Sequence, residues 1–312
     1  MVRLLYTSDK TFKGRTGQRR LSLPPLSILR IDRIEENKMK TNEINIRDPF
    51  VLSYDGKYYM YGSRVGVQTG FDVYISSDLE NWSEPKSVFE AYDGFWGTKD
   101  FWAPEVHLYN GKFYMFATFF SDNRLRGSQI LVSDTPDGEF TVWSEVITPD
   151  GWDCIDGTLY IENDEPYMIF CHSWTQVKDG EICAIKMTKD LKQRQGEPRL
   201  LWKAGDASWT VCFDKPDSGD YVTDGPYIYK DNEGKLCSLW SSFSKTGYAI
   251  AKAYSDNGKL NGKWILEENP IFAEDGGHGM IFETLDGKKL LSIHTGNGQS
   301  GTERPKFIEF ND

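Results

Sequence analysis

The sequence predicts an all-β fold, a five-bladed propeller with about four antiparallel strands per blade, and three observations support this prediction. First, an Asp-, Asn- or Glu-centred turn, usually with Gly, lies between two apolar, aromatic-rich runs at five places in the chain of 312 residues. Second, these turns recur about 53 to 69 residues apart, a spacing that suits one blade per copy. Third, no long stretch has the 3.6-residue period of a helix. The five copies are SYDGKYYMYG, LYNGKFYMFA, YIENDEPYMIF, IYKDNEGKLCSLW and FETLDGKKLLSIH.

A second β-like segment follows each of these hairpins and supplies the third and fourth strands of its blade. These segments are rich in Val, Ile, Tyr and Ala, and they end in the Asp, Asn, Gly and Ser residues that stop a strand and reverse the chain. The last of them, KFIEF from Lys306, is too short for a full blade. We therefore expect part of residues 40–47 to pair with it, which would close the ring and hide the sheet edges.

The repeats predict one propeller domain over residues 40–312, because five similar units must close on one another to bury their shared faces. Residues 1–39 match no blade, and the first forty residues carry ten Lys and Arg against four Asp and Glu. Two interpretations of this basic extension remain open. It is either a disordered arm or the result of a start site assigned upstream of the true one at Met39, and we favour the second.

Composition limits the class of protein. A formal net charge of −11 argues against nucleic-acid binding, and no uninterrupted apolar segment is long enough to predict a membrane span. The five cysteines show neither CxxC nor zinc-ligand spacing, so we expect reduced thiols packed among strands. No signal peptide is evident, and the expected location is cytoplasmic, or periplasmic or secreted if the N-terminus is mis-assigned. We expect a monomer or a weak homo-oligomer.

An ionisable residue stands ahead of each repeat: Asp48 in RDPF, Glu105 in WAPE, Asp156 in IDGT, Asp224 in TDGP and His278 in GGHG. The first strand of each propeller blade lines the central channel, so we expect these residues to meet at one mouth of it. A single Asp before Gly or Pro is an ordinary turn residue. Several buried carboxylates are costly through desolvation and repulsion, which indicates a chemical task or a bound cation. Facing carboxylates are the groups that hydrolyse glycosides, one protonating the leaving oxygen and another activating water or attacking carbon.

These segments resemble glycoside hydrolase family 43, inverting five-bladed propeller enzymes that act mainly on arabinose- and xylose-containing polysaccharides. The resemblance covers nearly all of residues 44–310 and rests on the order and spacing of the five motifs together. It implies that Asp48 is the general base, that Asp156 tunes the proton donor and orients the sugar, and that the TDGP segment supplies the general acid. It also implies a calcium or sodium ion near His278 at the channel axis. Arg304 resembles a position where the family has a cation beside the acids, although a surface ion pair is its alternative.

The chain departs from the family pattern at the general acid. The family has Glu-Gly-Pro where this chain has Asp224, a side chain one methylene shorter and slightly more acidic, with a pKa of about 3.9 against about 4.3. Three alternatives follow: the blade advances to compensate, which we favour; Glu105 or His172 is the acid instead; or the activity has been lost.

Candidate substrate-binding residues are Trp102, Glu105, His172, Trp174 and Arg304. An aromatic face covers the apolar face of a sugar ring, although most tryptophans in a propeller pack between blades. His172 follows the second strand of the third repeat and is expected at the border of the channel mouth. His278 has an alternative to ion binding, which is to orient a neighbouring acid or water.

The function that these expectations favour is an exo-acting α-L-arabinofuranosidase or β-D-xylosidase that hydrolyses O-glycosyl bonds of plant-type oligosaccharides. Loops at residues 89–99 and 202–221 are candidates for closing one end of the site into a pocket. Alternatives are an endo-acting arabinanase or xylanase, and a catalytically silent carbohydrate-binding propeller. No organic cofactor is implied, because displacement by water needs only an acid and a base.

Overall fold

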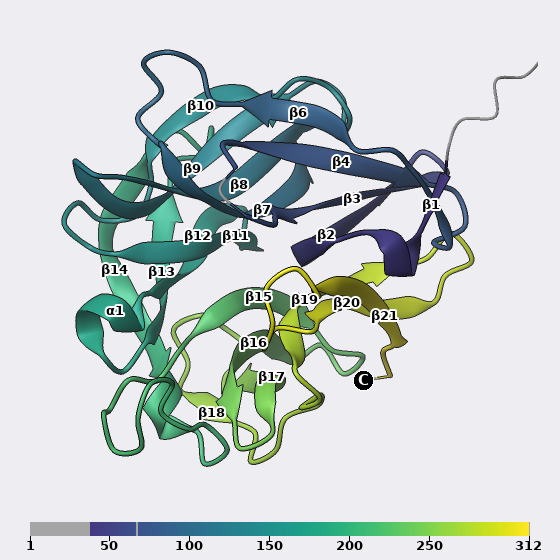
Figure 1. Cartoon of the computed structure of the whole chain (residues 1–312). Coiled ribbons are helices and arrows are strands. Elements are labelled where there is room, and N and C mark those ends of the chain that lie inside the picture. The colour runs from purple at the N-terminus through teal and green to yellow at the C-terminus, as the bar shows by residue number, and fades with distance from the viewer. Residues whose placement is uncertain (1–37, 67, 312) are drawn as a thin grey trace, which may run out of the picture. The chain divides into compact units, whose positions relative to one another are not determined.

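The computed structural model describes residues 38–66 and 68–311, and within them it confirms the all-β, five-bladed propeller (Figure 1). Each blade is a small antiparallel sheet. In the last four blades the strands follow chain order from the channel outwards, whereas in the first blade the strand that comes first in the sequence is the outermost. The basic extension, residues 1–37, lies outside the described residues, and so does the choice between its two interpretations.

The blades follow one another along the chain. Blade 1 contains β1 (Lys38–Lys40), β2 (Ile46–Tyr54), β3 (Lys57–Arg64), β4 (Gly70–Ser76), β5 (Asn81–Ser83) and β6 (Lys86–Glu90). Blade 2 contains β7 (Lys99–Tyr109), β8 (Lys112–Ser121), β9 (Arg124–Ser133) and β10 (Thr141–Val146). Blade 3 contains β11 (Cys154–Glu162), β12 (Glu165–His172), β13 (Glu181–Met187) and β14 (Arg194–Lys203).

The last two blades are smaller. Blade 4 contains β15 (Asp224–Lys230), β16 (Leu236–Ser244), β17 (Gly247–Ser255) and β18 (Trp264–Leu266), and blade 5 contains β19 (Gly276–Glu283), β20 (Lys289–Thr295) and β21 (Arg304–Glu309). The short helical turns are η1 (Thr41–Glu43), α1 (Trp174–Val177) and η2 (Ala204–Asp206).

Tight turns join the first and second strands of the blades, as the sequence predicts. Asp55 and Gly56 have φ of 47° and 70°, and Asn110 and Gly111 have φ of 46° and 79°. Two consecutive residues with positive φ form the hairpin turn whose twist matches that of the flanking strands, and Asn-Gly and Asp-Gly are the pairs that adopt it most readily.

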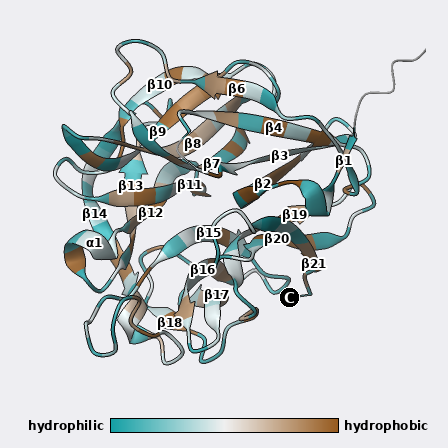
Figure 2. Cartoon of the chain, viewed as in Figure 1, coloured by the Kyte–Doolittle hydropathy of each residue, from teal (hydrophilic) through white to brown (hydrophobic). Residues whose placement is uncertain are grey.

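The first strands β2, β7, β11, β15 and β19 surround the centre, each in contact with the next (Figure 1). Apolar residues concentrate on the strands and polar residues on the connecting loops (Figure 2). The loop at 89–99 belongs to this core, because the Phe95 ring lies 5.4 Å from that of Phe89 and 5.0 Å from that of Phe119. This loop therefore packs between blades 1 and 2, where it stabilises the fold.

Ring closure differs from the expectation. Within the described residues β21 pairs with β20 alone, and residues 40–47 add no strand to it, because β1 pairs with β5 and residues 41–43 form η1. Two side chains hold the ends together instead: Asn45 Nδ2 donates to the Glu303 carbonyl at 2.8 Å, and Arg304 Nε donates to the Asn42 carbonyl at 3.0 Å.

The cysteines have no disulfide partners, as the sequence analysis expects. All five cysteines are free, with Cys154, Cys171, Cys183 and Cys237 buried and Cys212 partly exposed. Among the described residues, no helix has the length and apolar character that a membrane crossing requires.

Candidate active site

The same irregularity occurs in all five inner strands and builds the site. The pairing of each inner strand with the second strand shifts at an equivalent place, with one further shift at Asp100 in β7, and one residue at the shared place adopts the left-handed conformation. Such bulges re-aim side chains and are common beside active sites. Side chains other than Gly rarely adopt this conformation, so the neighbouring structure must hold it. The residues are Asp48 (φ 53°), Ala103 (φ 46°), Asp156 (φ 58°), Gly225 (φ 50°) and His278 (φ 48°).

This register refines the expectation that five ionisable residues occupy matching positions. Asp48, Asp156 and His278 occupy the bulge position of their blades. Asp224 immediately precedes the bulge residue of blade 4, and Glu105 follows that of blade 2 by two residues. Three of the five are therefore equivalent, and the other two are offset along their strands.

The three aspartates and His278 line one cavity of 350 Å³, together with Arg47. His278 Nδ1 lies 3.2 Å from Asp48 Oδ1 and 3.8 Å from Asp156 Oδ2. The Gly225 N–H donates to Asp156 Oδ2 at 3.0 Å. In addition, the Tyr248 hydroxyl donates to Asp224 Oδ2 at 3.0 Å.

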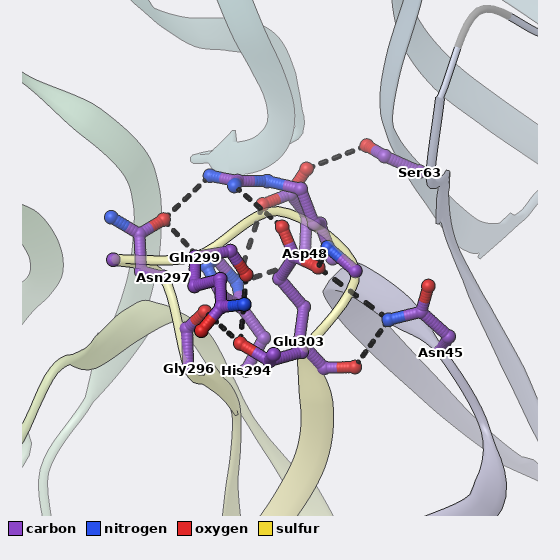
Figure 3. Close-up of polar contacts among 12 residues, drawn as sticks. Asn45, Asp48, Ser63, His294, Gly296, Asn297, Gln299 and Glu303 are labelled. Carbon is purple, nitrogen blue, oxygen red and sulfur yellow. Dashed lines mark hydrogen bonds and ion pairs between the residues drawn. The ribbon is translucent and has the colours of Figure 1, made fainter.

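A chain of hydrogen bonds holds Asp48 in its left-handed conformation (Figure 3). Its N–H donates to His294 Nδ1 at 3.1 Å, and the Ser63 hydroxyl donates to Asp48 Oδ2 at 2.5 Å. Because His294 Nδ1 accepts the hydrogen bond from this N–H, the neutral ring carries its hydrogen on Nε2, which donates to Asn297 Oδ1 at 3.2 Å. Main chain and carboxylate of Asp48 are thus both fixed.

Arg47 and Arg64 are the arginines that line this cavity, and the sequence analysis selected neither. Arg47 is the one whose charge contributes to the low pKa of Asp48. Its Nη2 donates to Asn297 Oδ1 at 2.7 Å, and its Nη1 lies 3.3 Å from the buried Glu303 carboxylate. The one feature of the sequence that could have pointed to Arg47 is its position directly before Asp48. The strand bulge that turns Arg47 toward the site is not visible in the sequence. The expected cation, Arg304, does not line this cavity and instead donates to the backbone carbonyls of Asn42, Gly301 and Glu303.

The environments of the carboxyl groups separate their proton affinities. Burial opposes the charge on Asp48, but His278, His294 and Arg47 outweigh it and lower its pKa to about 2. Burial raises the pKa of Asp156 and of Asp224, and the negative charge of Asp48 adds to both effects. An ionised carboxylate can accept a proton from water while a protonated one donates to a leaving oxygen, so this arrangement can perform acid–base chemistry.

A second cavity of 540 Å³ adjoins the first. The two share the lining residues Arg47, Trp102, Ile155, Asp224 and Asn297. Trp102 is 36% exposed, and the Arg126 guanidinium lies over its ring at 5.0 Å. The predicted Trp174 also lines this cavity, with its ring 5.0 Å from that of Phe213, a residue of the 202–221 loop.

Glu105 and His172 line neither cavity. Glu105 is buried, with its Oε2 3.3 Å from His107 Nε2. His172 Nδ1 lies 3.0 Å from Glu181 Oε2, its Nε2 lies 2.8 Å from Gln176 Oε1, and its ring stacks on Trp152 at 4.1 Å. Contact of these two side chains with substrate stays a prediction, and this geometry does not support it.

His278 Nε2 is the candidate atom for binding a cation. His278 Nε2 is buried and has no hydrogen-bond partner among residues 38–66 and 68–311. The same residues contain no group of three or more His, Cys, Asp and Glu side chains arranged to hold a metal ion. A single imidazole does not meet the tetrahedral demand of zinc, and calcium takes oxygen ligands, so a calcium or sodium ion here would have to be bound mainly by water.

Fold and site together define a propeller glycosidase, and comparisons with known proteins agree. The family model described as "Glycosyl hydrolases family 43" matches residues 42–309, and the chain belongs to this family.

Three similar proteins are informative. The crystal structure titled endo-arabinase from Bacteroides thetaiotaomicron is 40% identical, superposes with a TM-score of 0.82, and covers 88% of this chain and 97% of its own. "Probable arabinan endo-1,5-alpha-L-arabinosidase A" of Emericella nidulans is 26% identical over 78% of this chain and 74% of its own. "Extracellular endo-alpha-(1->5)-L-arabinanase 1" of Bacillus subtilis is 24% identical over 63% of this chain and 71% of its own.

The neutral state of His294 predicts a loss of stability in acid. Burial lowers the pKa of His294 to about 4, below its ordinary value of 6.5. Between these values the unfolded chain binds more protons than the folded one. The contribution of neutral His294 to the free energy of unfolding is therefore fully present above pH 6.5. About 3 kcal/mol of this contribution is lost as the pH falls from 6.5 to about 4.

Denaturant unfolding across this pH range measures the effect. His294→Asn places an amide oxygen near Nδ1 and cannot titrate, so its free energy of unfolding is expected to fall less steeply with acid than that of the wild type. The difference between the two proteins should be constant at alkaline pH, where neither side chain titrates, which serves as the internal control. Parallel curves throughout would contradict a neutral, buried His294.

Proposed function

We propose that this glycosidase is an inverting, endo-acting arabinanase that cleaves α-1,5-linked arabinofuranosyl chains. The observation that carries the proposal is that Asp224 lines both adjoining cavities. A proton donor at the junction of two cavities has room for sugar units on either side of the bond it cleaves. An exo-acting enzyme needs such room on one side only.

The three similar proteins support the same choice, since each is named for endo action on arabinan. The sequence analysis favoured an exo-acting enzyme and kept endo action as an alternative, and the alternative is now the better supported of the two. The loop at 89–99, one of the two candidates for closing the site, packs between blades instead.

In the proposed mechanism, Asp48 accepts a proton from the water that attacks the anomeric carbon. Asp224 protonates the glycosidic oxygen from the opposite side of the sugar, so the configuration at the anomeric carbon inverts. The Tyr248 hydroxyl donates to Asp224 Oδ2, which leaves Oδ1 as the oxygen that carries the proton. Burial and the negative charge of Asp48 raise the pKa of Asp224, which holds that proton in place until the bond breaks.

Asp224 is also the best supported of the alternatives for the general acid. It lines both cavities, whereas Glu105 and His172 line neither. We propose further that His278, in its neutral form with the hydrogen on Nδ1 toward Asp48, contributes Nε2 to the binding of a largely hydrated calcium or sodium ion at the channel axis. The ion would then supply the positive charge that a protonated His278 supplies without it. The chain's own residues perform the proton transfers.

Hydrolysis of linear α-1,5-arabinan tests the function. We expect viscosity to fall early relative to the release of reducing ends, oligosaccharide products, and inversion of the first-formed anomer in proton NMR. Asp48→Asn should lower kcat/KM by about 10³-fold or more, because the water loses its base. Asp224→Asn should lower it by about 10²-fold or more on arabinan, but much less on a nitrophenyl arabino-oligoside, whose leaving group needs little protonation.

The exposed Asp93 provides the matched control, since Asp93→Asn makes the same chemical change away from the cavities. Release of arabinose alone from chain ends would overturn endo action. Oligosaccharide binding without cleavage of any glycoside would favour the silent carbohydrate-binding alternative.

The ion proposal predicts a calcium- or sodium-dependent melting temperature. After dialysis against a chelator, one of these ions should raise the Tm of the wild type by a few degrees, because a ligand bound only by the folded state stabilises it. His278→Gln should show little response, with Asp93→Asn responding as the wild type does. Equal responses of wild type and His278→Gln, or no response of the wild type to either ion, would contradict the proposal.

A further inference from the structure

The five bulges share a hydrogen-bond rule that one blade breaks. In four blades the N–H of the bulge residue donates to a side chain from the second strand of the preceding blade. The four pairs are Ala103 N–H to Ser63 Oγ at 2.7 Å, Asp156 N–H to Thr118 Oγ1 at 2.9 Å, His278 N–H to Ser241 Oγ at 2.8 Å and Asp48 N–H to His294 Nδ1 at 3.1 Å. A buried N–H without an acceptor would cost about 1–3 kcal/mol.

The acceptors occupy one register position. Each pairs with the residue just before the bulge of its own blade, as Ser63 does with Arg47 and Ser241 with Asp224. In blade 3 this position, opposite Ile155, is Cys171. A thiol is a weak hydrogen-bond acceptor, so the rule fails at the bulge that Cys171 would serve, Gly225.

The freed Gly225 N–H donates to Asp156 Oδ2 at 3.0 Å instead. It is the hydrogen-bond donor to this carboxylate among the described residues, while His278 Nδ1 lies 3.8 Å away. Because Gly225 follows Asp224 directly, the bond fixes the Asp156 carboxylate relative to the segment that carries the candidate acid.

We propose that Cys171 is a positioning residue, which by offering no strong acceptor leaves the Gly225 N–H free to hold Asp156 against the Asp224 segment. This inference rests on the proposed function for its kinetic readout alone. A hydroxyl at position 171 would restore the rule of the other four blades and compete with Asp156 for the N–H. It would also lie beside the buried Thr223 Oγ1, which already interacts with the Cys171 thiol, so the folded state should accept it.

Cys171→Ser and Cys171→Ala separate positioning from packing. The serine variant adds an acceptor at nearly constant volume and should lower kcat about tenfold or more, with KM within about threefold and a Tm at or above that of the wild type. The alanine variant adds no acceptor but leaves a gap, so it should have the lower Tm and retain clearly more kcat than Cys171→Ser. The order of activity is thus expected to be the reverse of the order of stability, which a purely structural role would not produce.

Cys183→Ser and Cys183→Ala are matched controls, since Cys183 is a buried thiol on β13 of the same blade and lines neither cavity. They should change Tm and leave kcat unaffected. Cys171→Thr repeats the test with the side chain that serves as acceptor on β8, in case the serine variant does not fold.

A crystal structure of Cys171→Ser gives a readout independent of substrate. Gly225 N should lie within hydrogen-bond distance of the introduced hydroxyl and no longer bond Asp156. Retention of the Asp156 bond, wild-type kcat in Cys171→Ser, or an equal loss in Cys171→Ala would overturn the proposal. An inactive wild type on arabinan would instead reject the proposed substrate, and the crystal structure would still decide the role of Cys171.

Discussion

The hydrogen bond from each bulge N–H to the neighbouring blade is the interaction on which the rest of the site depends. At these positions the inner strands leave regular pairing and adopt a left-handed conformation that side chains other than Gly rarely adopt. Acceptors such as Ser63 and His294 stabilise that conformation and connect one blade to the next. The same contacts therefore hold the ring of blades together and point Asp48, Asp156 and His278 into one cavity.

Concentrated negative charge then sets the chemistry. Three buried carboxyl groups face Arg47 and His278, while the buried His294 stays neutral, which leaves too little positive charge to ionise all three easily. Asp48 has His278 Nδ1 at 3.2 Å and the Ser63 hydroxyl, and it takes the charged state. Asp156 and Asp224 have weaker compensation and hold protons more tightly. Asp48 can act as the base and Asp224 as the acid because the charges of Arg47 and His278 act most strongly on Asp48.

Much of this could be predicted from the sequence, because turn chemistry and repeat spacing are local signals. The Asn110-Gly111 and Asp55-Gly56 turns predicted the hairpins, and the repeats predicted five blades. The motif positions also led to Asp48, Asp156, Asp224 and His278, which do meet in one cavity. The bulges could not be predicted in this way, because they depend on acceptors contributed by the preceding blade. That is why Arg47 was missed, why Arg304 was preferred to it, and why Glu105 appeared equivalent to the others.

Ring closure and the substrate cavities depend on contacts between distant segments in the same manner. The acceptor of Asp48 comes from β20 and the partner of Arg47 from the loop after it, roughly 250 residues away along the chain. The repeat pattern of the sequence does not predict contacts between residues so far apart. The choice between exo and endo action also depends on them, since the two cavities share residues from strands of four blades and from a loop of the fifth.

The most direct test of the central claim is a crystal structure of Asp224→Asn with a linear α-1,5-arabino-oligosaccharide. The account predicts a chain of sugars that occupies both cavities, with one glycosidic oxygen beside the side chain of residue 224 and a water between Asp48 and the anomeric carbon. An oligosaccharide confined to one cavity, with its terminal sugar enclosed, would contradict endo action. A chain bound with no glycosidic oxygen near residue 224 would contradict the assignment of Asp224 as the acid.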